Sequence, residues 1–595
     1  MYSQVDVMDD ETTSLVSPLE VESGHPTGSF TKVQLKENRI EQVNGGASQI
    51  NRWMGLSAAM IMMACNGLTY TYAVYSEFVK QKLHYSQERT DELGAAKDFG
   101  AIFGLVSGLC YFLFPPWMSI LIGALMHLLG YAVIFYTLTG KLRSSFWFLC
   151  ISSAVGTGGD NFVDTVCIMI ILENFGSHKG TAVGILKSQL GLSAAIFVAI
   201  YEAFLESKVP NFLFLITVVP SIVYVVLAFL IRPYPCNEET DQNDADQRFK
   251  LVSIFVIILG CFLMGVMILE GVFEIDGSIQ KFFAISTLSI MGIIFMAPLI
   301  KRPLKLFGDA IAVLFPSLCM LSSAQHHTHS DDESDGERII ARSIDHAYSK
   351  NGNLISKQEQ IAAQVDSETL SSTLWDSLFG IDFWLITFVV SSGAGSGLAI
   401  MNNFAQIGKA VRSDVVDEFV GIISIWSCFG RLVSGYGSDL LMKMGLSRPI
   451  CLLISQMAMF ICCLILATGS TLFLFIGSAV VGLAYGSYWT LAPTIIAEVF
   501  GLKQVATLYK LLGLGPTILS YLLSAKVIGY LYDKESLYYK QNHQGIAEQN
   551  ACYGTQCFEY GLLSLGSVCF IGVLACAWFA YRTRKVYSKV HYAHS

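Results

Sequence analysis

The chain has 595 residues, of which 53% are hydrophobic and only 14% are charged, and its mean hydropathy is +0.52. In soluble globular proteins about a quarter of all residues are charged, so this composition excludes an ordinary soluble protein. The formal net charge of −9 comes largely from the polar tail and loops, and it gives no reason to expect a nucleic-acid partner. Apolar runs of about 18 residues or more recur along most of the chain, so the sequence predicts an all-α integral membrane protein with many spans.

The chain begins with a polar and acidic segment, residues 1–51. A segment of this composition cannot bury enough apolar surface to fold, so we expect a disordered cytosolic tail. It has neither the basic start nor the apolar core of a signal peptide, and the first span should therefore serve as the insertion signal.

The rest of the chain is organised by apolar runs, which predict fourteen transmembrane helices in groups of six, two and six. The expected spans lie at roughly 53–76, 97–114, 117–140, 145–172, 180–204, 211–231, 251–270, 281–300, 378–401, 416–437, 449–468, 472–497, 505–532 and 559–581. The expected parts are a first six-helix half (52–232), a linker with two middle spans (233–300), a largely disordered cytosolic loop (301–377), a second six-helix half (378–582) and a cytosolic tail (583–595). Twelve spans are the alternative, which requires both middle runs to be re-entrant or interfacial.

Lysine and arginine are more frequent in the loops on one side of the predicted spans, and in multi-span proteins that side is cytosolic. This distribution and the even number of spans predict that both termini and the 301–377 loop lie in the cytosol. The sequence does not distinguish the plasma membrane from a vacuolar or other internal membrane.

An internal repeat relates the two groups of six spans. Glu173 opens the sequence ENFG, which precedes a span with Lys187 near its start, and Glu498 opens EVFG before a span with Lys510 near its start. The offset of about 325 residues also carries the first span onto the ninth, and two related halves are typical of transporters with the solute site between them.

Asp160 and Asp164 lie four residues apart in the fourth span, so both carboxylates are expected on one face of its helix. Ionisable groups inside a bilayer cost several kcal/mol and usually mark the path of a solute or proton. Two such carboxylates repel each other unless a proton, a bound cation or Lys187 compensates them. We therefore predict a proton or cation site here, with a purely structural ion pair as the alternative.

Lys187 and Lys510 occupy matching places in the two halves. They predict either a site for an anionic solute or two lysines that extend to the membrane surface. Other polar residues within the spans need partners, and most such residues join helices; His127 titrates near neutral pH, but we expect a packing role for it. The predicted solute or proton pathway consists of Asp160, Asp164, Lys187, Gln189, Asn66, Asn402, Asn403 and Lys510.

The second half contains a motif within FGRLVSGYGSDLLMKMGLSRP, formed by Gly430, Arg431, Gly435, Asp439 and Arg448. This segment resembles the loop motif of the major facilitator superfamily, whereas the first half has Pro-Pro-Trp at the corresponding turn. In that superfamily such residues form a charge network that holds the two halves in one state. The resemblance therefore implies a conformational latch of Gly430, Arg431, Asp439 and Arg448.

Further segments resemble the plant nodulin-like branch of the same superfamily: NRWMGLSAAMIMMACNGLTYTYAVYS, AAKDFGAIFGLVSG, VGILKSQLGLS, FGLKQVATLYK and GYLYDKESL. The likeness covers most of the chain after residue 52, except the loop predicted to be disordered. It implies a major-facilitator-type bundle of two six-helix halves plus two extra middle spans, in a transporter-like protein with no settled substrate.

Cys552 and Cys557 lie in a loop that the topology places outside, where oxidising conditions favour a disulfide. The sequence has no catalytic motif, metal-ligand spacing or phosphate-binding loop, so it predicts no enzyme activity, no metal and no cofactor. The predicted function is secondary active transport of an unidentified small solute by alternating access, with protons as the coupling ion. The alternative is a non-transporting membrane sensor or scaffold with the same fold.

Overall fold

The computed structural model describes residues 52–85, 87–205, 208–234, 242–273, 276–300, 374–410, 416–532, 534–535 and 554–594. Every regular element in these ranges is a helix, which confirms the predicted all-α class. These residues belong to one compact unit, Asn51–Ser595. The tail 1–51 and nearly all of the 301–377 loop lie outside the described residues, so the predictions of disorder there stay predictions.

The N-terminal and middle parts of the chain form α2 (Arg52–Asn66), η1 (Gly67–Thr71), α3 (Tyr72–Leu83), α4 (Gln87–Asp98), η2 (Phe99–Ile102), α5 (Phe103–Leu113), α6 (Pro116–Leu138), α7 (Phe146–Asn174), η3 (Gly176–His178), α8 (Lys179–Phe204), α9 (Val209–Leu227), η4 (Ala228–Leu230), α10 (Gln242–Val272), α11 (Gly277–Met296) and η6 (Ala297–Leu299). The C-terminal part forms α15 (Leu374–Phe379), α16 (Ile381–Ala410), α17 (Val416–Lys443), α18 (Pro449–Ala467), α19 (Thr471–Val499), α20 (Leu502–Tyr521), the π-helical η7 (Leu522–Ile528) and α22 (Gln556–His594).

Local sequence determines where several of these helices begin. Pro116 and Pro449 are the first residues of α6 and α18, a position where the missing N–H costs no hydrogen bond. Ser145 caps α7, because its hydroxyl accepts a hydrogen bond of 3.3 Å from the N–H of Phe148. Gly501 has a φ of +84° directly before α20, a conformation that glycine adopts without steric cost.

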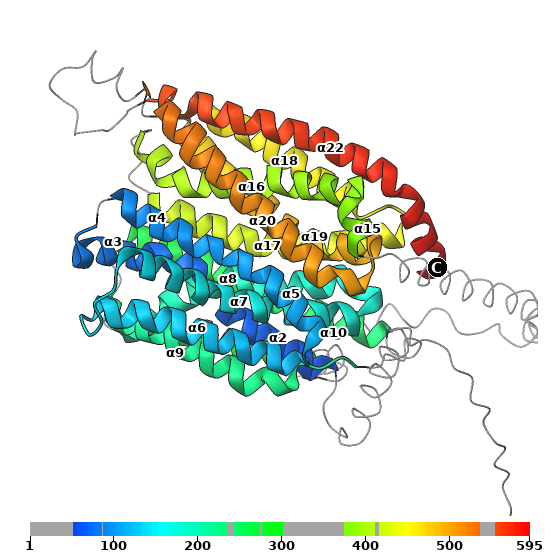
Figure 1. The fold of residues 1–595 in the computed structure, drawn as a ribbon, viewed down its shortest axis with the longest axis horizontal. Coiled ribbons are helices and arrows are strands. Elements are labelled where there is room, and N and C mark those ends of the chain that lie inside the picture. Colours follow the sequence, from blue (N-terminus) through cyan, green and yellow to red (C-terminus); the bar gives the residue numbers. More distant parts are fainter. Residues whose placement is uncertain are drawn as a thin grey trace, which may run out of the picture. The chain divides into compact units, whose positions relative to one another are not determined.

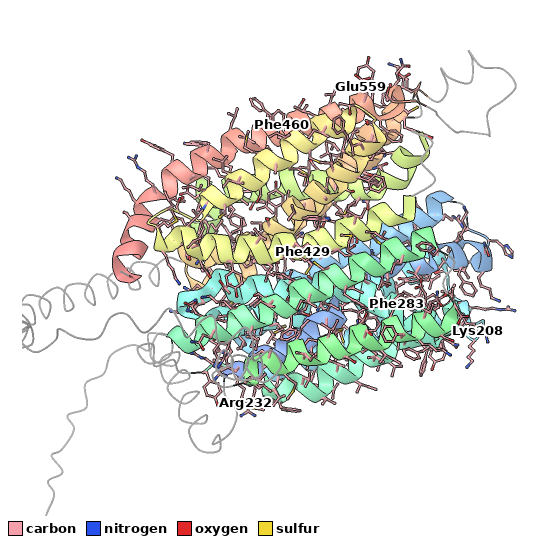
Figure 2. The ribbon with its side chains drawn as sticks, turned by 180° about the vertical axis from the view of Figure 1, so that it is seen from behind. Lys208, Arg232, Phe283, Phe429, Phe460 and Glu559 are labelled. Atoms are coloured by element: carbon pink, nitrogen blue, oxygen red, sulfur yellow. The ribbon has the colours of Figure 1, made fainter. Side chains whose placement is uncertain are left out.

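Twelve of the described helical stretches are long and apolar enough to cross a membrane. All fourteen predicted spans fall on helical segments; the two outside the twelve are the first, divided among α2, η1 and α3, and the tenth, α17. Figure 2 shows Lys208 and Arg232, which flank α9 and η4, at opposite ends of the bundle with apolar side chains such as Phe283 between them. The chain is therefore an integral membrane protein with many spans, and the choice between twelve and fourteen crossings stays a prediction.

The helices of the first part pack mainly on one another, with α6 against α7 and α9, and α2 against α8. Those of the last part do the same, with α18 against α22, α16 against α20, and α17 against α19. Figure 1 shows these two groups, and they meet where α8 packs against α17 and where α5 packs against α20. The two middle helices, α10 and α11, pack against each other and against α8.

Glycines allow α8 and α17 to approach until their backbones touch. A Cβ atom at Gly435 of α17 would lie 2.5 Å from the carbonyl oxygen of Gly180, and one at Gly184 of α8 would lie 2.7 Å from the carbonyl oxygen of Arg431. Small residues permit this kind of packing between membrane helices, where van der Waals contact replaces the hydrophobic effect as the driving force. The closest junction between the two groups of helices therefore depends on glycine.

We predict that Gly435→Val separates α8 from α17, because the added side chain collides with the backbone of α8. The native reporter is Cys428, a fully buried residue of α17 that packs against Gly191 of α8. Its alkylation by N-ethylmaleimide, followed by mass spectrometry, should increase in Gly435→Val. Gly437→Val is the matched control on the same helix, since a Cβ there would meet no atom of the described residues within 4 Å. Equal protection of Cys428 in Gly435→Val and wild type would contradict the prediction.

Candidate functional site

A cavity of about 1170 Å³ lies between the two groups of helices. Among the residues on its wall are Asp160, Asn161, Asp164, Lys187, Tyr509 and Lys510. The wall also includes Glu202 near the C-terminal end of α8 and Gln280 near the start of α11. The cavity therefore extends from the charged residues at mid-depth toward the end of the bundle that is opposite the α7–α8 junction.

Asp164 binds two lysines at the inner boundary of this cavity. Lys187 Nζ donates to Asp164 Oδ1 at 2.5 Å, and Lys510 Nζ donates to Asp164 Oδ2 at 2.6 Å. None of the three side chains is more than 8% exposed. Because Asp164 and Lys510 lie 346 residues apart on α7 and α20, the carboxylate connects the two groups of helices, and the three ionised side chains have a net charge of +1.

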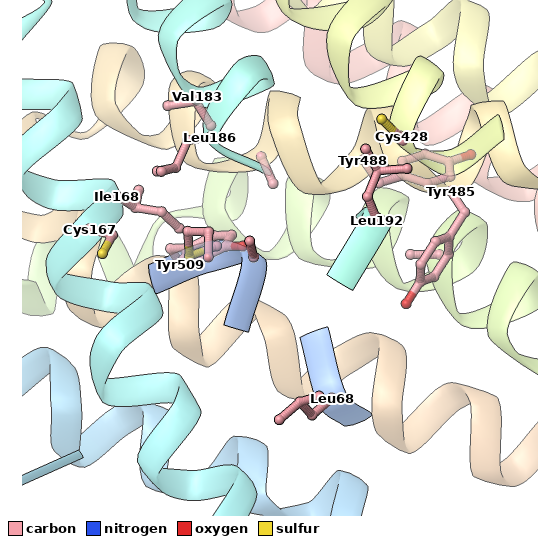
Figure 3. Close-up of a cluster of buried hydrophobic side chains, with 14 of the residues drawn as sticks. Leu68, Cys167, Ile168, Val183, Leu186, Leu192, Cys428, Tyr485, Tyr488 and Tyr509 are labelled. Carbon is pink, nitrogen blue, oxygen red and sulfur yellow. The ribbon is translucent and has the colours of Figure 1, made fainter. Parts of the chain in front are cut away.

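An aromatic ring and apolar side chains hold the two lysines away from the membrane surface. Lys187 Nζ and Lys510 Nζ lie 5.5 Å and 5.4 Å from the ring centroid of Tyr509, within the range of a cation–π interaction. Figure 3 shows Tyr509 in the same buried cluster as Ile168 of α7 and Leu186 of α8. These contacts argue against the alternative in which both lysines extend to the lipid headgroups.

Asp160 has other partners than Asp164, although the two are one helical turn apart. Its Oδ1 lies 2.8 Å from Nδ1 of His127 and accepts a hydrogen bond of 3.2 Å from the hydroxyl of Tyr224. Its backbone carbonyl accepts a hydrogen bond of 2.7 Å from the amide of Asn66. The structure therefore separates the expected pair of carboxylates into one group held by lysines and one held by a histidine.

Three other residues of the predicted pathway, Asn402, Asn403 and Gln189, lie in different surroundings. Asn402 lines the cavity, while the amide of Asn403 donates to Ser524 Oγ at 2.7 Å and to the carbonyl of Ala399 at 2.8 Å. Gln189 is fully buried, and within the described part of the chain its side-chain amide has no hydrogen-bond partner. Asn403 thus joins helices, and Asn402 alone of these three borders the cavity.

The α8–α17 junction closes the end of the bundle opposite the cavity. Asp439 of α17 accepts hydrogen bonds from the N–H groups of Gly180 at 3.1 Å and Thr181 at 2.7 Å, at the start of α8. A carboxylate is favourable there because the first turn of a helix has unpaired N–H groups and a partial positive charge. Asp439 also pairs with Arg448 Nη1 at 2.6 Å, and Arg448 Nε pairs with Glu498 at 2.6 Å.

Two of the four residues predicted as a latch make this contact, namely Asp439 and Arg448. Arg431 instead donates to the backbone carbonyl of Lys187 at 3.3 Å, and Gly430 packs against the backbone of Leu483 within the second group of helices. The segment that carries the motif lies at this contact, but a single motif does not specify which basic residue meets the aspartate, and the latch role stays a prediction. We use the word latch below for Gly180, Thr181, Asp439, Arg448 and Glu498.

His178 lies beside this latch, with its Nδ1 at 3.6 Å from Asp246. Burial is the main cause that lowers the pKa of His178 below its ordinary value. Burial therefore favours the neutral imidazole, and the cation that pairs with Asp439 is Arg448.

Sequence reasoning missed Tyr224, Tyr509 and Asn161, and it assigned His127 to packing. Asn161, one turn before Asp164 at the position after Asp160, accepts from Lys510 Nζ at 3.0 Å. A histidine inside an apolar span was the available signal for His127, but its partner is 33 residues away in the sequence. Cys557 is disulfide-bonded, but Cys552 lies outside the described residues. The predicted disulfide between the two therefore stays a prediction.

We predict that Asp439→Ala destabilises the protein by about 3 kcal/mol, because it leaves a buried Arg448 with one carboxylate fewer and two N–H groups without an acceptor. Thermal unfolding of the purified protein in detergent measures this as a lower midpoint. Asp382→Ala is the control, since Asp382 pairs with Arg582 at a site where both side chains are about one-third exposed, and such pairs contribute about 1 kcal/mol or less. Equal midpoints for the two variants would show that Asp439 does not stabilise the closed latch.

Known protein families match both the N-terminal and the C-terminal part of the chain. The family model described as Nodulin-like matches residues 52–301, and the model of the NFD4 C-terminal domain matches residues 373–589. The Arabidopsis thaliana protein NUCLEAR FUSION DEFECTIVE 4 is 23% identical over 561 residues, which cover 91% of this chain and 90% of that protein. A Neurospora crassa protein named "Probable transporter mch1" is 21% identical over 627 residues and 91% of each chain.

The arrangement of the helices is similar to that of solved membrane transporters. A double-tryptophan mutant of XylE aligns with a TM-score of 0.50 at 12% identity, over 89% of this chain and 94% of that one. XylE is described, in a structure that aligns with a TM-score of 0.48, as a major facilitator superfamily proton:xylose symporter. At this level of identity the likeness concerns the fold alone.

Proposed function

Since the chain belongs to the nodulin-like family of the major facilitator superfamily, we propose that it is a secondary active transporter that moves a small solute by alternating access. Its fold is that of a membrane transporter, and its relatives include proteins named as probable transporters. The observation that carries the proposal is the cavity whose inner boundary is an ion cluster shared by both groups of helices.

Alternating access requires contacts between the two groups of helices that close the cavity on one side and can break. At one end the latch holds α8 against α17 through two backbone hydrogen bonds and the Asp439–Arg448 pair. At mid-depth, the Asp164–Lys510 pair holds α7 against α20. Release of both contacts would let the two groups of helices rock apart at the latch end, which the distribution of basic residues places in the cytosol.

The charges of the cavity favour a small anion as the solute. Two lysines share one carboxylate, and Arg431 also lines the wall. An anionic group that reaches Lys510 would replace part of the charge of Asp164 and weaken the bond between α7 and α20. Solute binding would then act directly on the contact that holds the two groups of helices together.

We predict that Lys510→Gln weakens the binding of a small anion by about 2 kcal/mol, or roughly thirtyfold, because a buried charge pair with the solute is lost. Asp164 keeps Lys187 as a partner, so the fold is retained. The measurement is counterflow of radiolabelled carboxylates into vesicles that contain the purified protein. The panel would be chosen from anions that accumulate in cells lacking the protein.

Lys503→Gln is the matched control for this variant, because Lys503 lies on the same helix and is exposed. Wild-type counterflow in Lys510→Gln would exclude the cluster as the solute site. If no member of the panel enters vesicles with the wild-type protein, the alternative of a non-transporting sensor or scaffold gains support.

A further inference from the structure

His127 and Asp160 form a buried pair that is separate from the cluster around Asp164. His127 lies on α6 with none of its surface exposed. Its Nδ1 is 2.8 Å from Oδ1 of Asp160 on α7, and its Nε2 is 3.0 Å from the carbonyl oxygen of Ile216 on α9. One imidazole ring therefore bridges two oxygen atoms on two different helices.

The carbonyl of Ile216 is available to His127 because of a proline. In a regular helix this carbonyl would accept the N–H of the residue four positions later, and in α9 that residue is Pro220, which has no N–H. A carbonyl oxygen only accepts hydrogen bonds, so Nε2 of His127 carries a hydrogen atom. The other ring nitrogen, Nδ1, is left to interact with Asp160.

The two contacts of His127 require the His127–Asp160 pair to hold one proton more than a neutral imidazole and an ionised carboxylate hold together. With Nε2 protonated, either Nδ1 accepts from a protonated Asp160, or Nδ1 also carries a proton and faces the carboxylate as an imidazolium. Without this proton, an oxygen of Asp160 would face a lone pair of Nδ1 at 2.8 Å. If the hydrogen atom were on Nδ1 instead, the lone pair of Nε2 would face the carbonyl oxygen of Ile216 at 3.0 Å.

From this geometry we propose that the His127–Asp160 pair is the site that binds and releases the coupling proton. The inference rests on the proposed transport function and adds the location of the coupling ion. Uptake transfers one proton from a hydronium ion in the cavity to the carboxylate of Asp160, which leaves a water molecule and raises the charge of the pair by one. Release to water on the other side of the membrane reverses the step.

Asp160 connects this pair to the cavity. Its side chain lines the cavity wall although it is only 4% exposed. Within the described residues its buried Oδ2 has no hydrogen-bond partner, so one carboxylate oxygen keeps a lone pair that can accept a proton. The other oxygen, Oδ1, contacts His127.

Asp164 is less suited to this role, because each of its oxygens already accepts a hydrogen bond from a lysine. Its charge is balanced without a proton. In the described part of the chain, Asp160 forms its ion pair with His127, whose own charge depends on the same proton. The one-turn spacing of the two carboxylates thus places a solute site and a proton site side by side on α7.

Other titratable groups surround the pair. Tyr131 packs against His127 with ring centroids 4.5 Å apart and ring planes tilted by 37°. The titratable groups that interact electrostatically with Asp160 or with Tyr131 are Cys65 on α2, Tyr75 on α3, Asp98 on α4, Asp164 on α7 and Tyr224 on α9. The thiol and phenols are neutral when protonated, Asp164 is paired with Lys187 and Lys510, and Asp98 is paired with Lys97.

Loss of the proton would disturb the packing of several helices at once. The pair joins α6, α7 and α9 through the contacts of His127, and Asn66 of α2 binds the backbone of Asp160. A shift of α7 that relieves the conflict at His127 also moves Asp164 relative to Lys510. Proton release is therefore linked mechanically to the bond between α7 and α20.

The solute-independent test is infrared difference spectroscopy of the purified full-length protein with ¹³C-labelled aspartate. Spectra are compared between an alkaline and a mildly acidic buffer, and both pH values lie above the range in which exposed carboxyl groups titrate. We expect a change in the aspartate bands that disappears in Asp160→Asn and is altered in His127→Gln. Tyr224→Phe is the matched control, since it removes a hydrogen bond to the same oxygen and should retain the change. His127→Gln decides the matter if Asp160→Asn does not fold, because its amide can still donate to Asp160.

The proposal would be overturned if the aspartate bands change with pH in Asp160→Asn as in wild type, or if His127→Gln leaves them unaltered. A second test compares counterflow with accumulation driven by a pH gradient, for any carboxylate that wild-type vesicles take up. Both variants should retain counterflow and lose accumulation above equilibrium, whereas retained accumulation contradicts the proposal. Absence of counterflow in wild type would instead refute the transport function, and the infrared result would stand by itself.

Discussion

The structure depends on one carboxylate, Asp164, which pairs with two lysines in the middle of a membrane protein. An ionised side chain in such a place costs several kcal/mol unless it is paired. In the described part of the chain, the ion pairs of Lys187 and Lys510 are both made with Asp164, so the two groups of helices come together at this carboxylate. The proposed solute access, closure of the cavity and neighbouring proton exchange all depend on contacts next to this cluster.

Backbone features place the functional side chains at each level of the bundle. The first-turn N–H groups of α8 receive Asp439 because Gly180 and Gly435 allow the two helices to touch. Pro220 frees a carbonyl of α9, which then orients His127 toward Asp160. In a bilayer every such backbone group must find a partner inside the protein, so glycine and proline positions determine where polar contacts between helices form.

Much of the fold is predictable from the sequence, because spans in a bilayer must be long, apolar and helical. The repeat around Glu173 and Glu498 also identifies Lys187 and Lys510 as equivalent residues. It does not reveal that both bind Asp164, since a pair separated by 346 residues depends on how the halves dock. The spacing of Asp160 and Asp164 predicts a shared face but not their separate partners, because His127 comes from another helix and becomes oriented only through the carbonyl that Pro220 leaves free.

The central claim is that the Asp164–Lys510 pair keeps the two groups of helices together. The most direct measurement is the distance between spin labels at Arg232 and Lys585, two exposed residues at the latch end of the first and second groups of helices, by pulsed electron paramagnetic resonance. In Lys510→Gln the distribution should gain a population at longer distances, because the closed state keeps the latch but loses the bond between α7 and α20. Identical distributions in wild type and Lys510→Gln would contradict the account.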